Sequence, residues 1–151
     1  MQTYLADAGM QRALAEAHRS LNEGGIPIGA ALMDDERRIV GVGHNRRVQQ
    51  KSPVLHAEID CLAAAGPRHD YAGLVMYSTL MPCYMCAGAI IQFRIRHIVV
   101  GEARNFPGAK ELLCEHGVEV VDLDSPVCRD LLSVFIQAHR DLWLEDIGAN
   151  F

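Results

Sequence analysis

The sequence has little basic charge, few aromatic residues and no long apolar run. Its 151 residues include 14 Lys and Arg against 19 Asp and Glu, which gives a formal net charge of −5. Binding along a phosphate backbone needs the opposite charge, so nucleic acid is disfavoured as a partner. The apolar runs are far shorter than the roughly 20 residues that cross a bilayer, so we expect no membrane contact. No basic start followed by an apolar stretch is present, so we expect no secretory signal.

The cysteines are few and odd in number, which argues against a disulfide framework. The sequence contains Cys61, Cys83, Cys86, Cys114 and Cys128. An odd number without an export signal predicts a reducing compartment, the cytoplasm. Cys61, Cys114 and Cys128 lie among apolar neighbours on expected helices, so we predict that they are core residues. The other two form a C-x-x-C pair, which is typical of a redox dithiol or of a metal site.

Length and patterning predict one domain over residues 1–151, without internal repeats or a linker. Apolar periodicity predicts helices over residues 7–22, 55–65, 83–93, 109–116 and 126–140. It predicts strands over residues 26–33, 38–43, 74–79, 97–101 and 118–123, with a loop over residues 46–53. A hairpin followed by strands that alternate with helices is typical of an α/β fold. We expect a three-layer α/β/α sandwich with a mixed central sheet of about five strands.

Two short motifs carry the chemistry of the chain: H-A-E at residues 56–58 and P-C-Y-M-C at residues 82–86. His56, Cys83 and Cys86 offer one imidazole and two thiolates, a ligand set that suits zinc. Three protein ligands leave the fourth position for water, as in catalytic zinc sites. Both motifs begin expected helices, whose N-terminal dipoles favour thiolates over thiols. Glu58 follows His56 too closely to be a second ligand on the same helical face, so we predict that it shuttles protons beside the metal-bound water.

Two other interpretations of these motifs are weaker. A closed structural zinc site, as in a zinc-stabilised interaction domain, needs a fourth ligand, and no other Cys or His lies near either motif. A redox dithiol leaves His56 and Glu58 without a role. The six remaining histidines show no spacing typical of ligands, so we expect them at the surface or as helix caps. They are His18, His44, His69, His97, His116 and His139.

The spacing H-x-E…P-C-x-x-C is the signature of zinc-dependent base deaminases, so the chain resembles the cytidine and deoxycytidylate deaminase superfamily. Within it, the chain resembles the small homodimeric cytosine deaminases of the fungal type over nearly its whole length. The shared segments outside the zinc motifs are residues 23–29 (EGGIPIG), 43–45 (GHN), 88–91 (GAII), 100–102 (VGE), 105–106 (NF) and 143–148 (WLEDIG). The resemblance implies one zinc ion per chain, a homodimer, and hydrolysis of free cytosine to uracil and ammonia in pyrimidine salvage.

The same resemblance implies a substrate pocket. Its expected lining residues are Ile28, Asn45, Ala57, Met81, Phe106, Trp143 and Asp146. Asn45 would hydrogen-bond the carbonyl and ring-nitrogen edge of the base, and the backbone N–H of Ala57 would donate to the carbonyl. Phe106 would stack on the ring, and Asp146 would accept from the exocyclic amine. By residue type alone, the alternatives are a turn residue at Asn45, a core residue at Trp143 and a solvated charge at Asp146.

Several positions depart from the fungal pattern. Met81 replaces a small polar residue, Leu144 replaces an aromatic residue, and Ala57 replaces a glycine between the two catalytic residues. An extra segment, residues 149–151, follows the tail. These departures leave isocytosine, another small amino-heterocycle or guanine as alternative substrates. A tRNA adenosine deaminase would need a basic surface and tail, whereas the segment from residue 143 carries acidic residues and no basic one.

Overall fold

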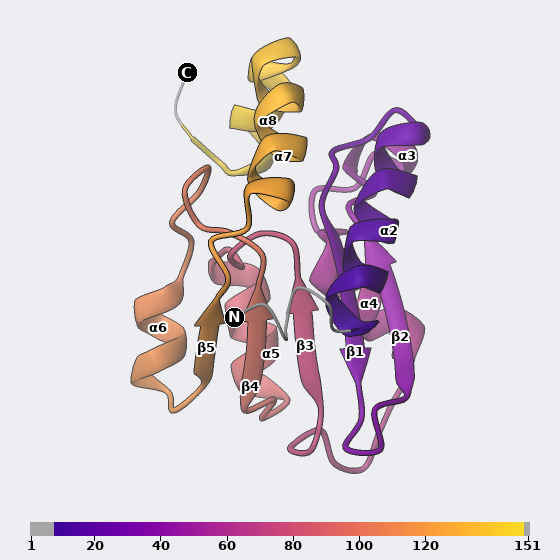
Figure 1. Cartoon of the computed structure of the whole chain (residues 1–151), viewed down its shortest axis with the longest axis vertical. Helices are drawn as coiled ribbons and strands as arrows, with labels where there is room; N and C mark the ends of the chain where they lie inside the picture. Colours follow the sequence, from indigo (N-terminus) through magenta and orange to yellow (C-terminus); the bar gives the residue numbers. More distant parts are fainter. Residues whose placement is uncertain (1–7, 150–151) are drawn as a thin grey trace.

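A five-stranded mixed sheet lies at the centre of the fold (Figure 1). The computed structural model describes residues 8–149. The strands are β1 (Gly29–Met33), β2 (Ile39–His44), β3 (Val75–Ser78), β4 (His97–Val100) and β5 (Glu119–Asp122). Their order in the sheet is β2-β1-β3-β4-β5. β1 pairs with β2 and with β3 in antiparallel fashion, whereas β3, β4 and β5 run parallel to one another.

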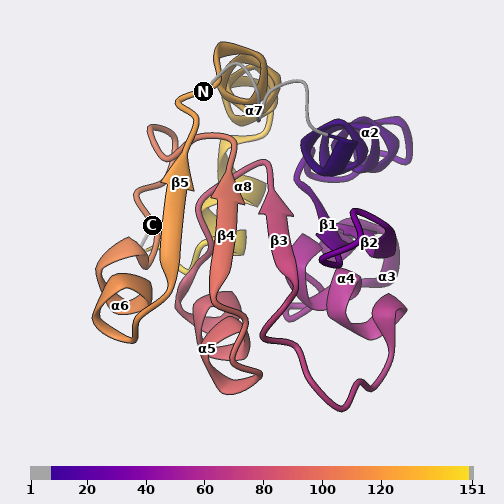
Figure 2. The ribbon, with the colours of Figure 1, turned by 60° about the horizontal axis from the view of Figure 1, so that its bottom comes forward.

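Helices cover both faces of this sheet. They are α2 (Ala8–Asn22), α3 (Arg47–Gln50), α4 (Ala57–Ala65), α5 (Tyr84–Gln92), α6 (Lys110–Glu115), α7 (Pro126–Ala138) and α8 (Arg140–Asp146). α2 and α7 lie on one side of the sheet, and α4, α5 and α6 lie on the other (Figure 2). This arrangement confirms the predicted three-layer α/β/α sandwich. In the part of the chain that the structure describes, no helix is both long and apolar enough to cross a membrane.

Two groups of buried apolar side chains hold the layers together, and β1 contributes to both. All five of its residues are buried, and their side chains alternate between the two faces of the sheet. Ala30 and Leu32 belong to the larger core, on the side of α4 and α5. Ala31 and Met33 belong to the smaller core, with Met10 of α2. A strand that is buried on both faces has a continuous apolar sequence, which is why this strand was predictable.

Two helical segments differ from the predictions. The expected loop over residues 46–53 contains α3, which begins where the Arg47 backbone N–H donates to Oδ1 of Asn45 (3.0 Å) and ends at Lys51 in the left-handed conformation. The expected helix over residues 126–140 ends at Ala138, because His139 leaves the helical conformation (φ −137°, ψ 53°). The ring of His139 packs against Phe135, with centroids 4.8 Å apart. α8 then begins as a separate helix.

Two of the three predicted core cysteines are buried. Cys61 is 0% exposed and Cys128 is 3% exposed. Cys114 is exposed, so the core prediction for it is wrong. Its helix, α6, buries Leu113. Because successive helical residues lie about 100° apart around the axis, the next residue turns away from the core toward solvent.

α2 approaches β1 so closely that its backbone meets Gly29. A Cβ atom at this position would clash with the backbone carbonyl oxygen of Ala13 and the backbone nitrogen of Ala17. The absence of a side chain therefore allows α2 to lie directly on the strand. From this position α2 directs Glu16 and Ser20 toward the residues that end and follow β2.

We expect Gly29→Ala to destabilise the fold, because its Cβ cannot fit against the α2 backbone. Overpacking typically costs about 1–3 kcal/mol, and a clash with backbone rather than side chain places this variant at the upper end. Gly73→Ala is the matched control, since a Cβ there meets nothing within 4 Å. Urea unfolding gives both free energies, and equal stability of the two variants would contradict the close approach.

Candidate active site

His56 and Cys83 occupy equivalent positions, each immediately before a helix. His56 precedes α4, Cys83 precedes α5, and Cys86 lies in the first turn of α5. Nδ1 of His56 is 3.4 Å from Sγ of Cys83 and 3.7 Å from Sγ of Cys86, and all three ligand atoms lie within 4.8 Å of one another. In a tetrahedral zinc site, bonds of about 2.1 Å to nitrogen and 2.3 Å to sulfur put those atoms about 3.6 Å apart. The three side chains therefore fit one zinc ion.

Proton sharing within this cluster favours an ionised thiol at Cys83. A hydrogen bond with Cys86, helped by one with His56, outweighs burial and lowers the pKa of Cys83 to about 4. The hydrogen bond with Cys83 and burial both raise the pKa of Cys86. Burial opposes a charge on His56, but its contacts with Asp146 and Cys83 raise its pKa to about 10. Metal ligands bind in their deprotonated forms, so metal binding here releases protons from Cys86 and His56.

The other ring nitrogen of His56 faces a carboxylate. Nε2 lies 3.4 Å from Oδ1 of Asp146, whose side chain is 2% exposed. Because Nδ1 points at the two sulfur atoms, this contact keeps the ring oriented for a metal, as carboxylates do for many metal-binding histidines. Asp146, predicted at the substrate, therefore also contacts a candidate metal ligand.

Glu58 is buried beside the candidate metal ligands. It lies in the first turn of α4 and is 4% exposed. Burial raises the pKa of Glu58 to about 7, although the charge on His56 acts in the opposite direction. A carboxyl group whose pKa lies near neutrality can take up and release a proton at physiological pH. The surroundings of Glu58 therefore suit the predicted proton shuttle.

A narrow pocket opens beside the cluster. Its lining contains all of the predicted substrate residues: Ile28, Asn45, Ala57, Met81, Phe106, Trp143 and Asp146. His56, Glu58 and Cys83 line it too, whereas Cys86 is buried outside the lining. Leu80 and Ile147 complete the lining, and the sequence analysis missed both, although each adjoins a predicted residue. The substrate roles of these residues stay predictions.

The side-chain amide of Asn45 is held in one orientation. Its Oδ1 accepts from the backbone N–H of Arg47 (3.0 Å), and its Nδ2 donates to Oδ2 of Asp146 (3.2 Å). Asn45 is therefore a turn residue and a pocket-lining residue at once. One hydrogen on Nδ2 and one lone pair on Oδ1 are left for a substrate.

Aromatic and apolar side chains form much of the pocket wall. The rings of Phe106 and Trp143 meet edge to face, with centroids 6.3 Å apart and an angle of 89°. Trp143 is buried and belongs to the larger core as well as to the pocket. Met81 is buried in the lining, so this departure from the fungal pattern shapes the cavity, whereas the half-buried Leu144 lies outside the lining. In the extra segment, Ala149 is half-buried and residues 150–151 lie outside the described residues.

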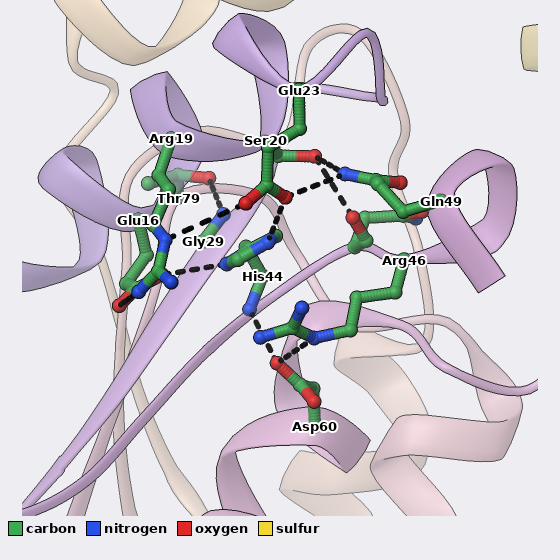
Figure 3. A network of polar contacts seen from close by, with 11 residues as sticks. Glu16, Arg19, Ser20, Glu23, Gly29, His44, Arg46, Gln49, Asp60 and Thr79 are labelled. Carbon is green, nitrogen blue, oxygen red and sulfur yellow. Dashed lines mark hydrogen bonds and ion pairs between the residues drawn. The ribbon is translucent and has the colours of Figure 1, made fainter.

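One histidine expected at the surface is completely buried. His44 is 0% exposed, and its ring nitrogens face Glu16 and Glu23 (Figure 3). The other histidines of that group are exposed, as predicted: His18, His69, His97, His116 and His139. The prediction for His44 is wrong because its carboxylate partners lie 28 and 21 residues away in the sequence, beyond the reach of local spacing rules.

Residues 4–102 match a known family, the cytidine and deoxycytidylate deaminase zinc-binding region. The matched segment contains His56, Cys83, Cys86 and Glu58. The chain belongs to this deaminase family. It is a zinc-dependent hydrolytic deaminase. The two motifs are therefore neither a redox dithiol nor a closed structural zinc site.

Relatives of this deaminase act on several substrates. It is 44% identical to a cytosine deaminase of Candida albicans over 142 residues, which cover 93% of this chain and 95% of the relative. It is 35% identical to a tRNA-specific adenosine deaminase of Haemophilus influenzae over 144 residues, which cover 87% and 83%. A solved structure from work on tRNA:A34 deaminases has a TM-score of 0.64 and 29% identity, covering 75% of this chain and 95% of that one. A guanine deaminase from Nitrosomonas europaea has a TM-score of 0.76 at 23% identity, covering 86% and 84%, and shows the shared fold.

We expect the purified deaminase to hold one zinc ion per chain and Cys86→Ala to lose it after dialysis, because two protein ligands cannot retain the ion as three do. Mass spectrometry of the bound metal measures the stoichiometry. Cys114→Ala is the matched control, since Cys114 is exposed and outside the cluster. A full zinc content in Cys86→Ala would contradict the assigned ligand set.

Proposed function

We propose that this deaminase hydrolyses free cytosine to uracil and ammonia. One observation carries the proposal: α8 places Trp143, Asp146 and, just beyond its end, Ile147 in the wall of the pocket that contains His56 and Glu58. The pocket is narrow and is enclosed by apolar and aromatic side chains on several sides. This shape supports a small, flat substrate such as a single heterocyclic ring.

The charges near α8 also favour a free base. α8 ends in Glu145 and Asp146, and the nearby Arg47 is paired with both, at 3.1 Å and 3.7 Å. That pairing leaves little positive charge beside the pocket to attract a phosphate backbone. The similarity to the Candida albicans cytosine deaminase extends over 95% of that protein and points to the same substrate.

Polar groups around the pocket match the edges of cytosine. Asn45 would meet the carbonyl and ring-nitrogen edge, and the backbone N–H of Ala57 would donate to the carbonyl oxygen. Oδ1 of Asp146, which is 3.4 Å from Nε2 of His56, would accept from the exocyclic amine. Phe106 would stack on the ring. A planar, uncharged base needs this combination of an apolar slot and a few fixed polar groups.

Glu58 would carry the protons of the reaction. His56, Cys83 and Cys86 would hold the zinc ion, which would supply Lewis acidity for activating water. Glu58 would take a proton from the attacking water and deliver it to ring atom N3 while the oxygen adds to C4. It would then move the proton of the new hydroxyl to the amine, so that the C4–N4 bond breaks and ammonia leaves. Cytosine and water thus become uracil and ammonia.

Met81 would influence which ring the pocket accepts. Its side chain lines the cavity, and Gly108 leaves room for it, since a Cβ at Gly108 would lie 2.7 Å from Cγ of Met81. A larger apolar wall narrows the pocket, which supports one ring over the two rings of guanine. Isocytosine or another single-ring amino-heterocycle is therefore the alternative substrate.

We also infer a homodimer. Tyr84 and Phe93, near the two ends of α5, are 73% and 43% exposed, and Val54, shortly before α4, is 50% exposed. Large apolar side chains at a surface are typical of contacts between protein chains.

A cytoplasmic location and a role in pyrimidine salvage belong to the same proposal.

We expect the zinc-loaded protein to release ammonia from cytosine and Glu58→Gln to lose that activity. Glutamine keeps the size of the side chain but carries no transferable proton, so kcat should fall by roughly 10²–10⁴-fold. Zinc content and Tm should stay at the wild-type values, because Glu58 is not among the metal ligands. A coupled ammonia assay measures turnover of both proteins on cytosine, isocytosine, guanine, adenine and a tRNA anticodon stem-loop.

Each outcome of this substrate panel has a distinct meaning. Turnover of cytosine alone supports the proposal. Turnover of another single-ring compound with cytosine inert retains the mechanism and assigns the specificity to the pocket around Met81. Ammonia release from the tRNA stem-loop alone would overturn the proposal that the substrate is a free base. Ammonia release from none of the compounds would overturn the proposed reaction.

We expect a chain that ends at Leu142 to bind the base poorly, because the pocket then loses Trp143, Asp146 and Ile147. The KM for cytosine should rise about tenfold or more, the equivalent of one lost hydrogen bond to a charged group. Steady-state kinetics measures KM, and the zinc content reports whether the remaining site is intact. An unchanged KM in the zinc-loaded variant would show that α8 does not contribute to binding of the base.

A further inference from the structure

His44 lies between two carboxylates at the end of β2 (Figure 3). Its side chain is completely buried, with Nδ1 2.6 Å from Oε2 of Glu16 and Nε2 2.8 Å from Oε1 of Glu23. Glu16 belongs to α2, and Glu23 directly follows that helix. The zinc motifs and the proposed reaction use none of these three residues, so their arrangement calls for an explanation.

Each ring nitrogen of His44 faces a carboxylate oxygen. A neutral imidazole has a single N–H, so its other nitrogen would direct a lone pair at a carboxylate. The two distances, 2.6 Å and 2.8 Å, are those of charge-assisted hydrogen bonds. The hydrogen bond with His44 also lowers the pKa of Glu23. These contacts together fit an imidazolium ion between two carboxylates.

The charges on α2 balance when His44 carries a proton. Arg19 lies 3.9 Å from Glu16 and 3.6 Å from Glu23, so it contacts the same two carboxylates. The carboxylates of Glu16 and Glu23 then face two cations, His44 and Arg19. With a neutral His44, the buried Glu16 carboxylate would have only the more distant Arg19 as a cationic partner.

The polar groups on the other elements around His44 do not change this balance of charges. Asp60 of α4 accepts from the backbone N–H of His44 (3.0 Å), and its charge is paired with Arg46 (2.9 Å) (Figure 3). Gln49 of α3 is neutral and donates to Glu23 (3.3 Å). His44 is therefore surrounded by hydrogen-bonded groups from α2, α3 and α4.

The position of His44 matters because the next residue is Asn45. The backbone N–H of Asn45 donates to the carbonyl oxygen of Ile28 (3.0 Å), and its own carbonyl oxygen accepts from Oγ of Ser20 (2.8 Å). Ser20 lies one turn after Glu16 on α2, so the helix that holds His44 also holds Asn45. Loss of the His44 contacts would free this segment of chain to shift beside the pocket.

We propose that His44, as an imidazolium ion paired with Glu16 and Glu23, is a positioning residue that fixes Asn45 for binding the base. The proposal rests on the proposed function, since it gives Asn45 a base to bind. Asn45 would touch the base equally in the ground state and in the transition state. A displaced amide therefore weakens binding and leaves the chemical step unchanged, which raises KM and not kcat.

Steady-state kinetics of zinc-loaded variants tests this role. Glu16→Ala removes one partner of His44 and should raise the KM for cytosine about tenfold or more, with kcat within about threefold of wild type. Glu16→Gln keeps the size and one hydrogen bond, and should return KM to within about threefold of wild type. Met10→Ala is the matched control, because Met10 is buried on α2 and outside the network. It should lower Tm and leave KM unchanged.

Two kinetic results would overturn the proposal. One is an unchanged KM in Glu16→Ala. The other is an equal rise of KM in Glu16→Ala and Met10→Ala, since general destabilisation would then explain both.

Nitrogen-15 NMR of the zinc-loaded protein gives a readout that does not depend on turnover. Both ring nitrogens of wild-type His44 should carry hydrogen, as the two short contacts require of an imidazolium, and one bare nitrogen would overturn this part of the proposal. The side-chain amide signals of Asn45 should shift in Glu16→Ala and stay in place in Met10→Ala; unshifted signals in Glu16→Ala would overturn the positioning role. If the wild type deaminates no base, the proposed function fails, while these signals still decide whether His44 positions Asn45.

Discussion

The active site depends on the direct contact between α4 and the backbone of β2. Gly43 makes this contact possible, since a Cβ there would lie 2.7 Å from the backbone carbon of Asp60 and 2.8 Å from the carbonyl oxygen of Ala57. With its backbone against the strand, α4 begins at His56, beside the point where Asn45 follows β2. A candidate metal ligand and the amide that faces the pocket thus come from two elements at a fixed spacing.

The second half of the site reaches the pocket from a different strand. Cys83 begins α5 after β3, and β1 lies between β3 and β2 in the sheet. The sheet therefore helps to set the distance between His56 and the two cysteines. The hydrogen bond that Cys83 and Cys86 share lowers the pKa of Cys83 and raises that of Cys86, so the two thiols compete for one proton. Bonds to a metal would replace that competition, so zinc loading and the stability of the fold are linked.

Local patterns were sufficient to predict the layers of the fold. Cys83 and Cys86 lie within one helical turn, so short-range rules reach that pair, whereas His56 lies 27 residues before Cys83 and was joined to it because the three residue types together make a zinc ligand set. The surroundings of His44 instead depend on residues 28 and 21 positions away, which the β1–β2 hairpin and α2 bring together. α8 continues the apolar pattern of α7, and the break at His139 carries no sequence signal such as proline or glycine. These features arise from tertiary packing, which overrides local preference. The pocket residues were predictable through the family resemblance and not through their spacing.

Asp146 links α8 to the residue that follows β2, at the wall of the pocket. Its Oδ2 accepts from Asn45 across 101 residues of sequence (3.2 Å), which fastens α8 to the end of β2. Its buried Oδ1 makes long contacts, 3.4 Å to His56 and 3.7 Å to Arg47, and lacks a hydrogen-bond partner within the described residues. A buried acceptor left in this state costs about 1–3 kcal/mol. On the proposed function, the exocyclic amine of the base would supply the missing donor, so the base would stabilise the docked position of α8. Departure of the amine as ammonia would remove that donor, so the product would lack the contact with Asp146 that the substrate makes.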